Sequence, residues 1–583
     1  MRTLRGLMIL WLVGAVSARA FVVNVDDAGR PRRWNLLSPD SLVSTNVLNR
    51  QTHAIRYYLA QDAYSAANRQ AELDAARASF DQWAAIPGTI LKFEFGGLAG
   101  PGVDINTEDN TNVVFWVKSR PPLVNGGLDD ITGVLGYAYY SFLDDNSLIE
   151  ADIVLNGADF SWSAESPPKN GTYSIEAVLL HEIGHLLGLE HSPVGGATML
   201  VRGESGESAQ AGLSSDEIAA VRTLYPEPAF AATLANLHGY VTMNGSGILG
   251  AVLTAEDAYG NVVAGTVTRA NGSYDVTALA PGNYQVRATP LDPAGYYSLL
   301  GGRDISPEWS GAVTGFLPSS PISVNLVAGD SQTRNFAVAG GNPAFRISRI
   351  RPPSADPAFY VVINAPASIR PGQSNMVVGV YSADLPTSNA TLTITGDGLT
   401  VGAPIFNPGK FGMNLISVPI SVAAAATPGM RGFVVQQGDN VSYANGFLTV
   451  LEPVPDFNFD GLDDRFQRQY FSPWTAPDAG PNANPDGDAF NNLAEYIAGT
   501  DPTNPASLLK IQWISASAEG VTMAWPSAAG KAYQVWGRPQ ISAGTWQPAS
   551  QPLTATGSLT QWTIASATNY AGFYRVQALP QQP

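Results

Sequence analysis

Residues 181–191 read HEIGHLLGLEH and contain three of the five histidines in the 583-residue chain. His181 and His185 are four positions apart, so a helix places both rings on one face, where they can bind one metal ion. Gly188 can adopt a positive φ and end this helix, which allows the chain to turn and bring His191 to the same ion. Three neutral imidazoles leave the fourth position of a zinc ion open to water, as in a catalytic site.

Glu182 directly follows the first of these histidines, where it would stand beside the water as general base. The alternative interpretation is a helix with incidental histidines. The two remaining histidines, His53 and His238, have no other histidine close to them in the sequence. We expect them to be surface or core residues, and the concentration of the other three favours a metal site.

The pattern resembles that of metzincin zinc peptidases, and its details resemble the matrixin (matrix metalloproteinase-like) branch. Ser192 follows the third histidine, as in matrixins, and Met199 lies in Gly-Ala-Thr-Met at the place of the family's Met-turn. Residues 213–225 resemble the family's closing helix, while 78–83 and 89–95 resemble its first helix and the next strand.

The resemblance extends over about residues 34–226 and implies an α+β catalytic domain. It implies that His181, His185 and His191 bind a catalytic zinc ion, with Glu182 as general base. Met199 would then be a packing residue beneath the metal. Protein or peptide substrates are the partners that such a site implies.

Three departures from the matrixin pattern limit what the resemblance implies. Tyr137 stands where matrixins usually have a histidine for a structural zinc, so we expect no second zinc ion. Leu200 and Val201 replace the family's Tyr-Pro, which leaves the wall of the specificity pocket undefined. The chain has no cysteine, so a cysteine switch is excluded, and residues 21–52 are too short for a full propeptide.

The segment Gly136–Phe142 (GYAYYSF) occupies the place of the family's upper edge strand. By analogy it would bind an extended peptide through main-chain hydrogen bonds. Aromatic packing on an edge strand is an equally good interpretation of Tyr139 and Tyr140.

Helical and strand patterns in the first part of the chain fit one α+β domain at residues 21–227. The pattern predicts helices at 61–85, at 173–187 and from Ser214, where Glu217 completes a capping box, and buried strands at 112–117 and 153–155.

The residue pattern of the sequence changes after about residue 236. Runs of Val, Thr, Tyr and Ile alternate with Asn-Gly and Pro-Gly turns, which predicts all-β sandwich modules. We assign them to 236–338, 342–452 and a C-terminal β domain at 506–583. Residues 268–284 resemble the carboxypeptidase-regulatory-like (transthyretin-like) β-sandwich, and the second module has the size of an immunoglobulin-like domain.

Residues 453–505 contain nine acids and two arginines, and their spacing predicts two EF-hand-like calcium loops. Oxygen-bearing side chains recur at the same spacing in both loops: Asp456, Asn458, Asp460, Asp464 and Gln467, then Asn484, Asp486, Asp488, Asn492 and Glu495. The pair resembles calcium repeats of the dockerin or thrombospondin type-3 kind. Gln467 replaces the usual Glu, and Ala489 replaces the usual turn glycine. The alternative is an acidic linker without a bound ion.

Composition and charge define the setting. Hydrophobic residues make up 45% and charged residues 14%, so the chain is globular. A net charge of −17 argues against nucleic acid or an anionic membrane as the main partner. Residues 1–20 have the basic, apolar and small-residue regions of a signal peptide, and no later stretch is apolar enough to span a bilayer. We therefore expect a secreted, bacterial protein, with metal ions in place of disulfides.

These patterns predict a multidomain protein with an α+β metzincin-like domain, several all-β modules and a small calcium-loop segment. The predicted function is that of a secreted zinc endopeptidase acting on extracellular proteins. The alternative is an adhesion or matrix-binding protein, in which the β modules bind a cell-surface or matrix ligand and the peptidase is accessory or self-processing.

Overall fold

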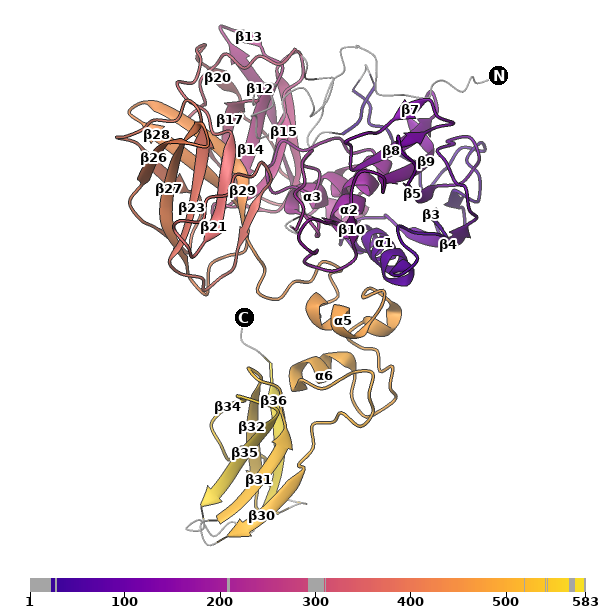
Figure 1. Cartoon of the computed structure of the whole chain (residues 1–583), viewed down its shortest axis with the longest axis vertical. Coiled ribbons are helices and arrows are strands. Elements are labelled where there is room, and N and C mark those ends of the chain that lie inside the picture. Colours follow the sequence, from indigo (N-terminus) through magenta and orange to yellow (C-terminus); the bar gives the residue numbers. More distant parts are fainter. Residues whose placement is uncertain are drawn as a thin grey trace. The chain divides into compact units, whose positions relative to one another are not determined.

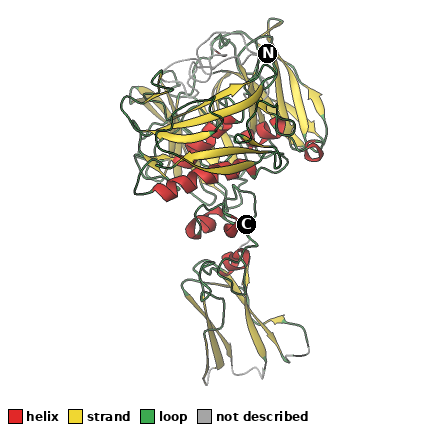
Figure 2. Ribbon diagram, turned by 90° about the vertical axis from the view of Figure 1, so that its right-hand side faces the viewer, coloured by secondary structure: helices red, strands yellow, loops and turns green. Residues whose placement is uncertain are grey.

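The computed structural model describes residues 23–26, 29–206, 210–291, 309, 311–517, 520–540, 542, 544–565 and 572–580. The expected signal peptide, residues 1–20, lies outside the described residues. The chain divides into two compact units, Met1–Pro453 and Val454–Pro583. Figure 2 shows how strongly strands predominate over helices.

An α+β domain with a mainly parallel sheet begins the first unit (Figure 1). The strand order is β1-β9-β5-β3-β2, with β4 beside β3 and β8 beside β9. The strands are β1 (Arg33–Trp34), β2 (Leu48–Asn49), β3 (Ala54–Ala60), β4 (Phe93–Ala99), β5 (Val113–Val117), β8 (Gly136–Phe142) and β9 (Ser147–Asn156). Strand β8 runs antiparallel to β9 and lies at the edge of the sheet, as the sequence predicts.

The helices of this domain are α1 (Arg69–Ala84), α2 (Ile175–Leu186), α3 (Ser215–Leu224) and the short α4 (Pro228–Ala231). Two short ladders complete it: β6 (Leu123–Val124) with β7 (Asp129–Asp130), and β10 (Trp162–Ser163) with β11 (Tyr173–Ser174). The predicted strands at 112–117 and 153–155 and the predicted helix at 173–187 are confirmed as β5, β9 and α2.

One helix is shorter than its sequence pattern suggests. Helix α1 begins at Arg69, whereas the pattern predicts a start at 61. Ala63 has a φ of 41°, which breaks helical geometry, and both the backbone N–H and the hydroxyl of Ser65 donate to the Glu72 carboxylate. These bonds hold residues before α1 in a turn. The capping box predicted at Ser214 and Glu217 is confirmed at the start of α3.

The remainder of the first unit is built from two β-sandwiches. The first combines sheet β13-β12-β16, to which β19 and β20 also pair, with sheet β15-β14-β17-β18. Its strands are β12 (Ala235–Met243), β13 (Ser246–Gly247), β14 (Ala251–Glu256), β15 (Val262–Val267), β16 (Ser273–Leu279), β17 (Gly282–Pro290), β18 (Ile322–Leu326), β19 (Ser331–Thr333) and β20 (Phe336–Val338).

The second β-sandwich combines sheet β21-β23-β27-β25, to which β26 pairs, with sheet β22-β29-β28-β24. Its strands are β21 (Arg349–Ser354), β22 (Ala367–Ile369), β23 (Met376–Ser382), β24 (Thr391–Ile394), β25 (Leu399–Val401), β26 (Ile405–Lys410), β27 (Met413–Val422), β28 (Gly429–Gln437) and β29 (Asn440–Val450). Inward-facing residues of both sheets, such as Val378 and Phe433, share one apolar core.

The α+β domain and the first β-sandwich share a continuous hydrophobic core. Val221 and Leu224 of α3 belong to the same buried cluster as Leu237 of β12 and Val276 of β16. Removal of either domain would therefore expose apolar surface on the other. Each Å² of apolar surface exposed to water costs about 25 cal/mol of free energy.

The second unit contains the predicted calcium loops and a small β domain. Its helices are α5 (Asp464–Tyr470), η3 (Pro477–Ala479) and α6 (Asn492–Ala498). Its strands are β30 (Trp513–Ser517), β31 (Gly520–Pro526), β32 (Ala532–Arg538), β33 (Gln547–Pro548), β34 (Leu553–Thr554), β35 (Leu559–Ala565) and β36 (Phe573–Leu579). Met523, Trp525, Tyr533 and Val535 form the centre of its core. Among all described residues, no helix is long and apolar enough to cross a membrane.

Candidate metal centre and substrate cleft

Helix α2 carries two of the three clustered histidines. Ser174 caps it by accepting a hydrogen bond from the backbone N–H of Ala177 at 3.2 Å. Leu179, Leu180 and Ile183 are fully buried and hold the helix against the core. His181 and His185 project from the other face, where they border a cavity of about 600 Å³.

The turn after α2 requires a glycine for two reasons. Gly188 has a φ of +96°, and a Cβ there would lie 2.1 Å from the carbonyl oxygen of Arg32. The N-terminal segment also pairs with this turn, because the backbone N–H of Asn24 donates to the Gly188 carbonyl at 2.9 Å. The chain can therefore reverse direction here and return His191 to the histidines of α2.

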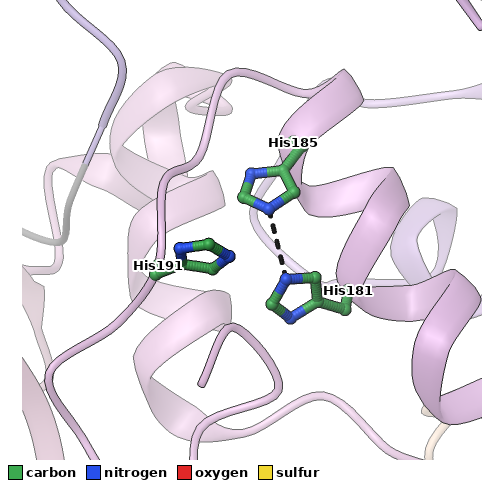
Figure 3. A group of neighbouring side chains, drawn as sticks. All are labelled: His181, His185 and His191. Carbon is green, nitrogen blue, oxygen red and sulfur yellow. Dashed lines mark hydrogen bonds between the residues drawn. The ribbon is translucent and has the colours of Figure 1, made fainter. Parts of the chain in front are cut away.

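The three imidazole rings lie close together (Figure 3): His185 meets the other two rings edge to face, and the rings of His181 and His191 are tilted by 34°. Their centroids are 4.8 Å apart for His181 and His185, 5.1 Å for His181 and His191, and 4.9 Å for His185 and His191. One nitrogen from each ring lies within 4.8 Å of the others, a spacing that one metal ion can bridge. The Nε2 atoms of His181 and His185 are 3.2 Å apart.

Backbone carbonyls orient the two helical histidines. Nδ1 of His181 donates to Thr198 O at 2.9 Å, and Nδ1 of His185 donates to Leu189 O at 2.8 Å. These bonds fix the tautomer, so each Nε2 lone pair faces the centre of the cluster. Burial lowers the pKa of His181 to about 3 and that of His185 well below its usual value. Neutral imidazoles are the form that binds a metal.

Glu182 lies beside the cluster with its carboxylate in the cavity wall. Its side chain is 5% exposed, and burial raises its pKa to about 8. A Cβ on Gly136 would lie 2.8 Å from Oε1 of Glu182, so the absence of a side chain in β8 gives this carboxylate its space. The group can therefore hold or release a proton near neutral pH.

Met199, which the matrixin resemblance assigns to the Met-turn, packs against helix α2 at Gly184. Its Sδ lies 2.3 Å from the position of a Cβ on Gly184, between the two helical histidines. The backbone N–H of Met199 donates to Glu217 of α3 at 2.9 Å. The capping box of α3 thus also fixes the segment that follows His191.

The cavity combines this cluster with an exposed sheet edge. Gly136, Tyr137, Ala138 and Tyr140 of β8 line one side, and residues 201–203 line the other. Because β8 pairs only with β9 among the described strands, its outer edge can accept main-chain hydrogen bonds from an extended peptide. Tyr139 is buried in an apolar cluster, so packing is its role, whereas Tyr140 borders the cavity.

Residues 49–226 match the family model for Matrixin. The match supports a matrixin-like, zinc metallopeptidase-like domain, and it contains the three histidines, Glu182 and Met199. No curated protein matches the chain.

Solved structures resemble the chain only loosely. They include a candidate carbohydrate-binding protein from Bacteroides uniformis, with 11% identity, 36% of this chain and 96% of that chain covered, and a TM-score of 0.12. The D1–D4 ectodomain fragment of ICAM-5 has 17% identity, covers 57% and 67%, and gives 0.15. The Bacillus anthracis TIE protein has 8% identity, covers 60% and 46%, and gives 0.14.

The other sequence-derived expectations for the matrixin-like domain can be located. Tyr137 packs against Tyr139, with ring centroids 4.7 Å apart. His53 donates from Nδ1 to the carbonyl of Leu36, and His238 hydrogen-bonds to Thr333. Both histidines lie outside the metal cluster, as expected from the sequence.

The second predicted calcium loop gathers its acidic side chains. Asp486, Asp488 and Glu495 offer carboxylate oxygens within 4.8 Å of one another. One oxygen of each accepts an internal hydrogen bond, from the backbone N–H of Asp488, the backbone N–H of Phe490 and the hydroxyl of Thr500. The other oxygen of each carboxylate is buried and has no hydrogen-bond partner.

Asn492 supplies a further oxygen to this loop. Its amide nitrogen donates to the carbonyls of Asp478 and Gly480, which turns Oδ1 the other way, buried and without a partner. Gly487, rather than position 489, has the positive φ of the turn, at +75°. Ala489 is therefore no obstacle to forming the loop. Asn484 closes it by hydrogen bonds to Gly487 and Asp488.

In the first predicted calcium loop, more of the side-chain oxygens accept internal hydrogen bonds than in the second loop. The amides of Asn458 and Gln467 both donate to Asp460, at 3.1 and 2.8 Å. Asp456 accepts from the backbone N–H groups of Asp460 and Gly461. Only Oδ1 of Asp464 is buried without a partner. Its acids do not gather within the distance that the second loop achieves.

Some residues of the cleft were not found from the sequence. Asn364 lines the large cavity, and Ala365 and Pro366 line a smaller one beside Glu182, although all three belong to the second β-sandwich. Asp216 of α3 accepts from both Ser192 and the backbone of Gly265 in the first β-sandwich. Nothing in the local pattern of these residues marks them, because their position depends on tertiary packing.

Proposed function

We propose that the chain is a secreted zinc-dependent endopeptidase that hydrolyses peptide bonds of extracellular proteins. The observation that carries the proposal is the convergence of three imidazoles with Glu182 in the wall of one cavity. The donor set fits zinc, because three histidine nitrogens with one open position are the ligands of a catalytic zinc site. The edge strand β8 supplies a place for an extended polypeptide.

Zinc bound to His181, His185 and His191 would act as a Lewis acid and lower the pKa of bound water toward about 7. The protein's own contribution is to orient the imidazoles through Thr198 O and Leu189 O and to keep the site partly buried. Glu182 would take a proton from the attacking water and return it to the leaving amine.

The proposal is tested by separating the base from the ligands. In the full chain, Glu182→Ala should retain zinc and lose about 10²–10⁴-fold or more in peptide cleavage, because only the base is removed. His185→Ala should lose the metal itself. His238→Ala is the matched control, since this histidine lies in the first β-sandwich and should leave zinc content and cleavage unchanged. Cleavage of a casein-like unfolded protein by Glu182→Ala at the wild-type rate would overturn the mechanism.

We propose that calcium binds in the second unit, with the loop formed by Asn484, Asp486, Asp488, Asn492 and Glu495 as the main site. The buried, unpartnered oxygens of this loop support a cation, because each costs free energy when left unsatisfied. Burial, and after it the charge of the neighbouring Asp486, raises the pKa of Glu495 to about 7. The role of such a site is structural, since metal binding adds to folding stability.

The loop formed by Asp456, Asn458, Asp460, Asp464 and Gln467 is the second proposed calcium site. It would have to exchange its internal amide bonds for metal bonds, so we expect weaker binding there. Calorimetric titration of the full chain with calcium tests both loops. Asp488→Asn should remove the tighter binding event, and Asp478→Asn, an exposed aspartate of the same segment, should not.

We further propose that residues 1–20 direct export of the chain from a bacterial cell. The support is the order of basic, apolar and small residues at the N-terminus. N-terminal sequencing of the protein recovered from culture medium should begin at Phe21. Retention of the whole chain inside the cells would overturn this proposal.

The two β-sandwiches are proposed to be carboxypeptidase-regulatory-like at 236–338 and immunoglobulin-like at 342–452, and residues 506–583 to be a separate C-terminal β domain. The paired sheets of each sandwich and their shared cores support these assignments. A solved structure of the secreted protein would test them by topology.

A further inference from the structure

The segment from Ser192 to Val201, here called the 192–201 loop, joins the third histidine to the wall of the cleft. Its N-terminal end pairs with its own C-terminal half, because the backbone N–H of Ser192 donates to Met199 O at 2.8 Å. Thr198 in this loop accepts from His181, and Val201 lines the large cavity. Anything that fixes the loop therefore also fixes the metal ligands and the cleft.

The first β-sandwich contacts this loop through a buried carboxylate. Oδ2 of Asp216 accepts from the Ser192 hydroxyl at 2.7 Å, and Oδ1 accepts from the backbone N–H of Gly265 at 2.7 Å. A Cβ on Gly265 would lie 2.5 Å from Val194. Strand β15 thus packs directly against the loop that follows His191.

The second β-sandwich contacts the same loop at backbone distance. The N–H of Gly195 donates to the carbonyl of Asn445 at 3.0 Å. A Cβ on Gly195 would lie 2.4 Å from Phe447, and a Cβ on Gly196 would lie 2.7 Å from Sδ of Met430. The two glycines let the loop lie flat on strands β28 and β29.

The end of the 192–201 loop is buried in the second β-sandwich. Leu200, only 2% exposed, belongs to the apolar cluster that includes Ile369 and Phe447, and Val201 packs against this cluster. These are the residues that replace the usual matrixin Tyr-Pro. The core of the sandwich therefore determines where this wall of the cleft stands.

A small cavity of about 70 Å³ opens beside Glu182 and His181, between α2 and the 192–201 loop. Ala365 and Pro366, from the segment before β22, close it on the side of the second β-sandwich. Its other apolar lining residues are Leu135, Ala177, Val178, Leu200 and Val201. At about 10–15 Å³ for each water-sized group, it has room for about five non-hydrogen atoms.

We propose that residues 364–366 of the second β-sandwich form part of the substrate site and limit the side chain that enters beside the scissile bond. The room admits a side chain no larger than that of Val, Leu or Met. The lining is mixed, because Arg202, Glu204 and Gln210 stand beside the apolar residues. This inference rests on the proposed peptidase function, which places the reacting bond at Glu182. The sandwich thereby acts as a specificity element of the enzyme.

The test compares two variants of Ala365 in the full chain on two sets of peptides, which differ at the residue before the cut or at the residue after it. Ala365→Phe should fill the small cavity and lower kcat/KM for a Leu peptide at least 10-fold relative to an Ala peptide, with zinc content unchanged. Ala365→Gly should raise the relative rate for a Phe peptide. Thr391→Phe, on the exposed face of β24, is the matched control and should leave both ratios unchanged.

The outcomes separate this inference from the proposed function. If the wild-type chain cleaves the peptides and neither Ala365 variant changes the ratio of their kcat/KM values, residues 364–366 have no role in specificity. The peptidase proposal would still stand. An absence of cleavage by the zinc-loaded wild-type chain would overturn the peptidase proposal and this inference with it. Ala365→Gly keeps the test decisive if the larger Phe side chain prevents folding.

Discussion

The sulfur atom of Met199 lies where a side chain on Gly184 would begin, 2.3 Å from the position of its Cβ. Gly184 is on α2 between His181 and His185, so the contact joins the ligand helix to the segment after His191. Gly184 is not among the described glycines with a positive φ, so its backbone conformation does not require glycine. Only the contact with Met199 requires that this position has no side chain.

Gly184→Ala should therefore displace Met199 and loosen the histidine cluster. We expect a cost of about 1–3 kcal/mol in the free energy of unfolding, as for overpacked cores, and weaker zinc affinity. Chelator competition and thermal unfolding measure the two effects. The double variant Gly184→Ala/Met199→Ala provides the control, because it restores the missing space. If it is no closer to the wild type in zinc affinity, the contact is not the cause.

Gly136→Ala should impair catalysis without affecting the metal. The new methyl group would lie 2.8 Å from Oε1 of Glu182, so the carboxylate must move. A displacement near 1 Å at a reacting group can cost about 10²-fold in rate. Zinc content and β8 should be unchanged, since no ligand is touched. Equal loss of zinc and activity would contradict this prediction.

Gly195→Ala should destabilise the first unit by about 1–3 kcal/mol, because its Cβ would meet Phe447 and the carbonyl of Asn445. Denaturant unfolding of the full chain measures this. Gly203→Ala is the matched control: no atom lies closer than 3.8 Å to its Cβ position. Equal stability of the two variants would show that the 192–201 loop does not bear on the second β-sandwich.

The stability of the first unit should fall as pH rises between about 4.5 and 8. Burial, together with the neighbouring charge of Asp152, raises the pKa of Glu150 to about 8, so the folded chain holds a proton that the unfolded chain releases in this window. Glu150→Gln removes this titrating group, so the decrease in stability between about pH 4.5 and 8 should become smaller. Unfolding midpoints at pH 5, 6, 7 and 8 measure the slope.

Glu94→Gln is the control for this experiment. The hydrogen bond from Arg56 lowers the pKa of Glu94, so its contribution is already complete above its unfolded value near 4.5. The slope between pH 5 and 8 should match that of the wild type. A Glu150→Gln variant with the same slope as Glu94→Gln would contradict the prediction.

Local patterns predict most of the matrixin-like domain. The period of α2, the all-buried run of β5 and the capping box of α3 depend on neighbours in sequence, and each is confirmed. The early start predicted for α1 is wrong, because the pattern does not show that Glu72 binds Ser65. The cluster of His181, His185 and His191 is also visible from spacing, since two ligands share a helix and a glycine returns the third.

The rest of the cleft depends on contacts between residues more than a hundred positions apart. Ala365 reaches the cavity beside Glu182 only because the 192–201 loop lies on β28 and β29. Neither Gly195 nor Asn445 carries a pattern that pairs them. The sequence likewise leaves the cleft wall at Leu200 and Val201 undefined, because these residues pack into the core of the second β-sandwich.

The shared core between α3 and the first β-sandwich has a consequence for how such a chain can diversify. The matrixin match ends at residue 226, yet the buried cluster that contains Leu224 also contains Leu237 and Val276 of the first β-sandwich. A recombination event between residue 226 and the first β-sandwich would separate residues of one hydrophobic core. Lineages that exchange the tail are therefore expected to keep the peptidase and both β-sandwiches as one heritable block, with exchange permitted at about residue 453.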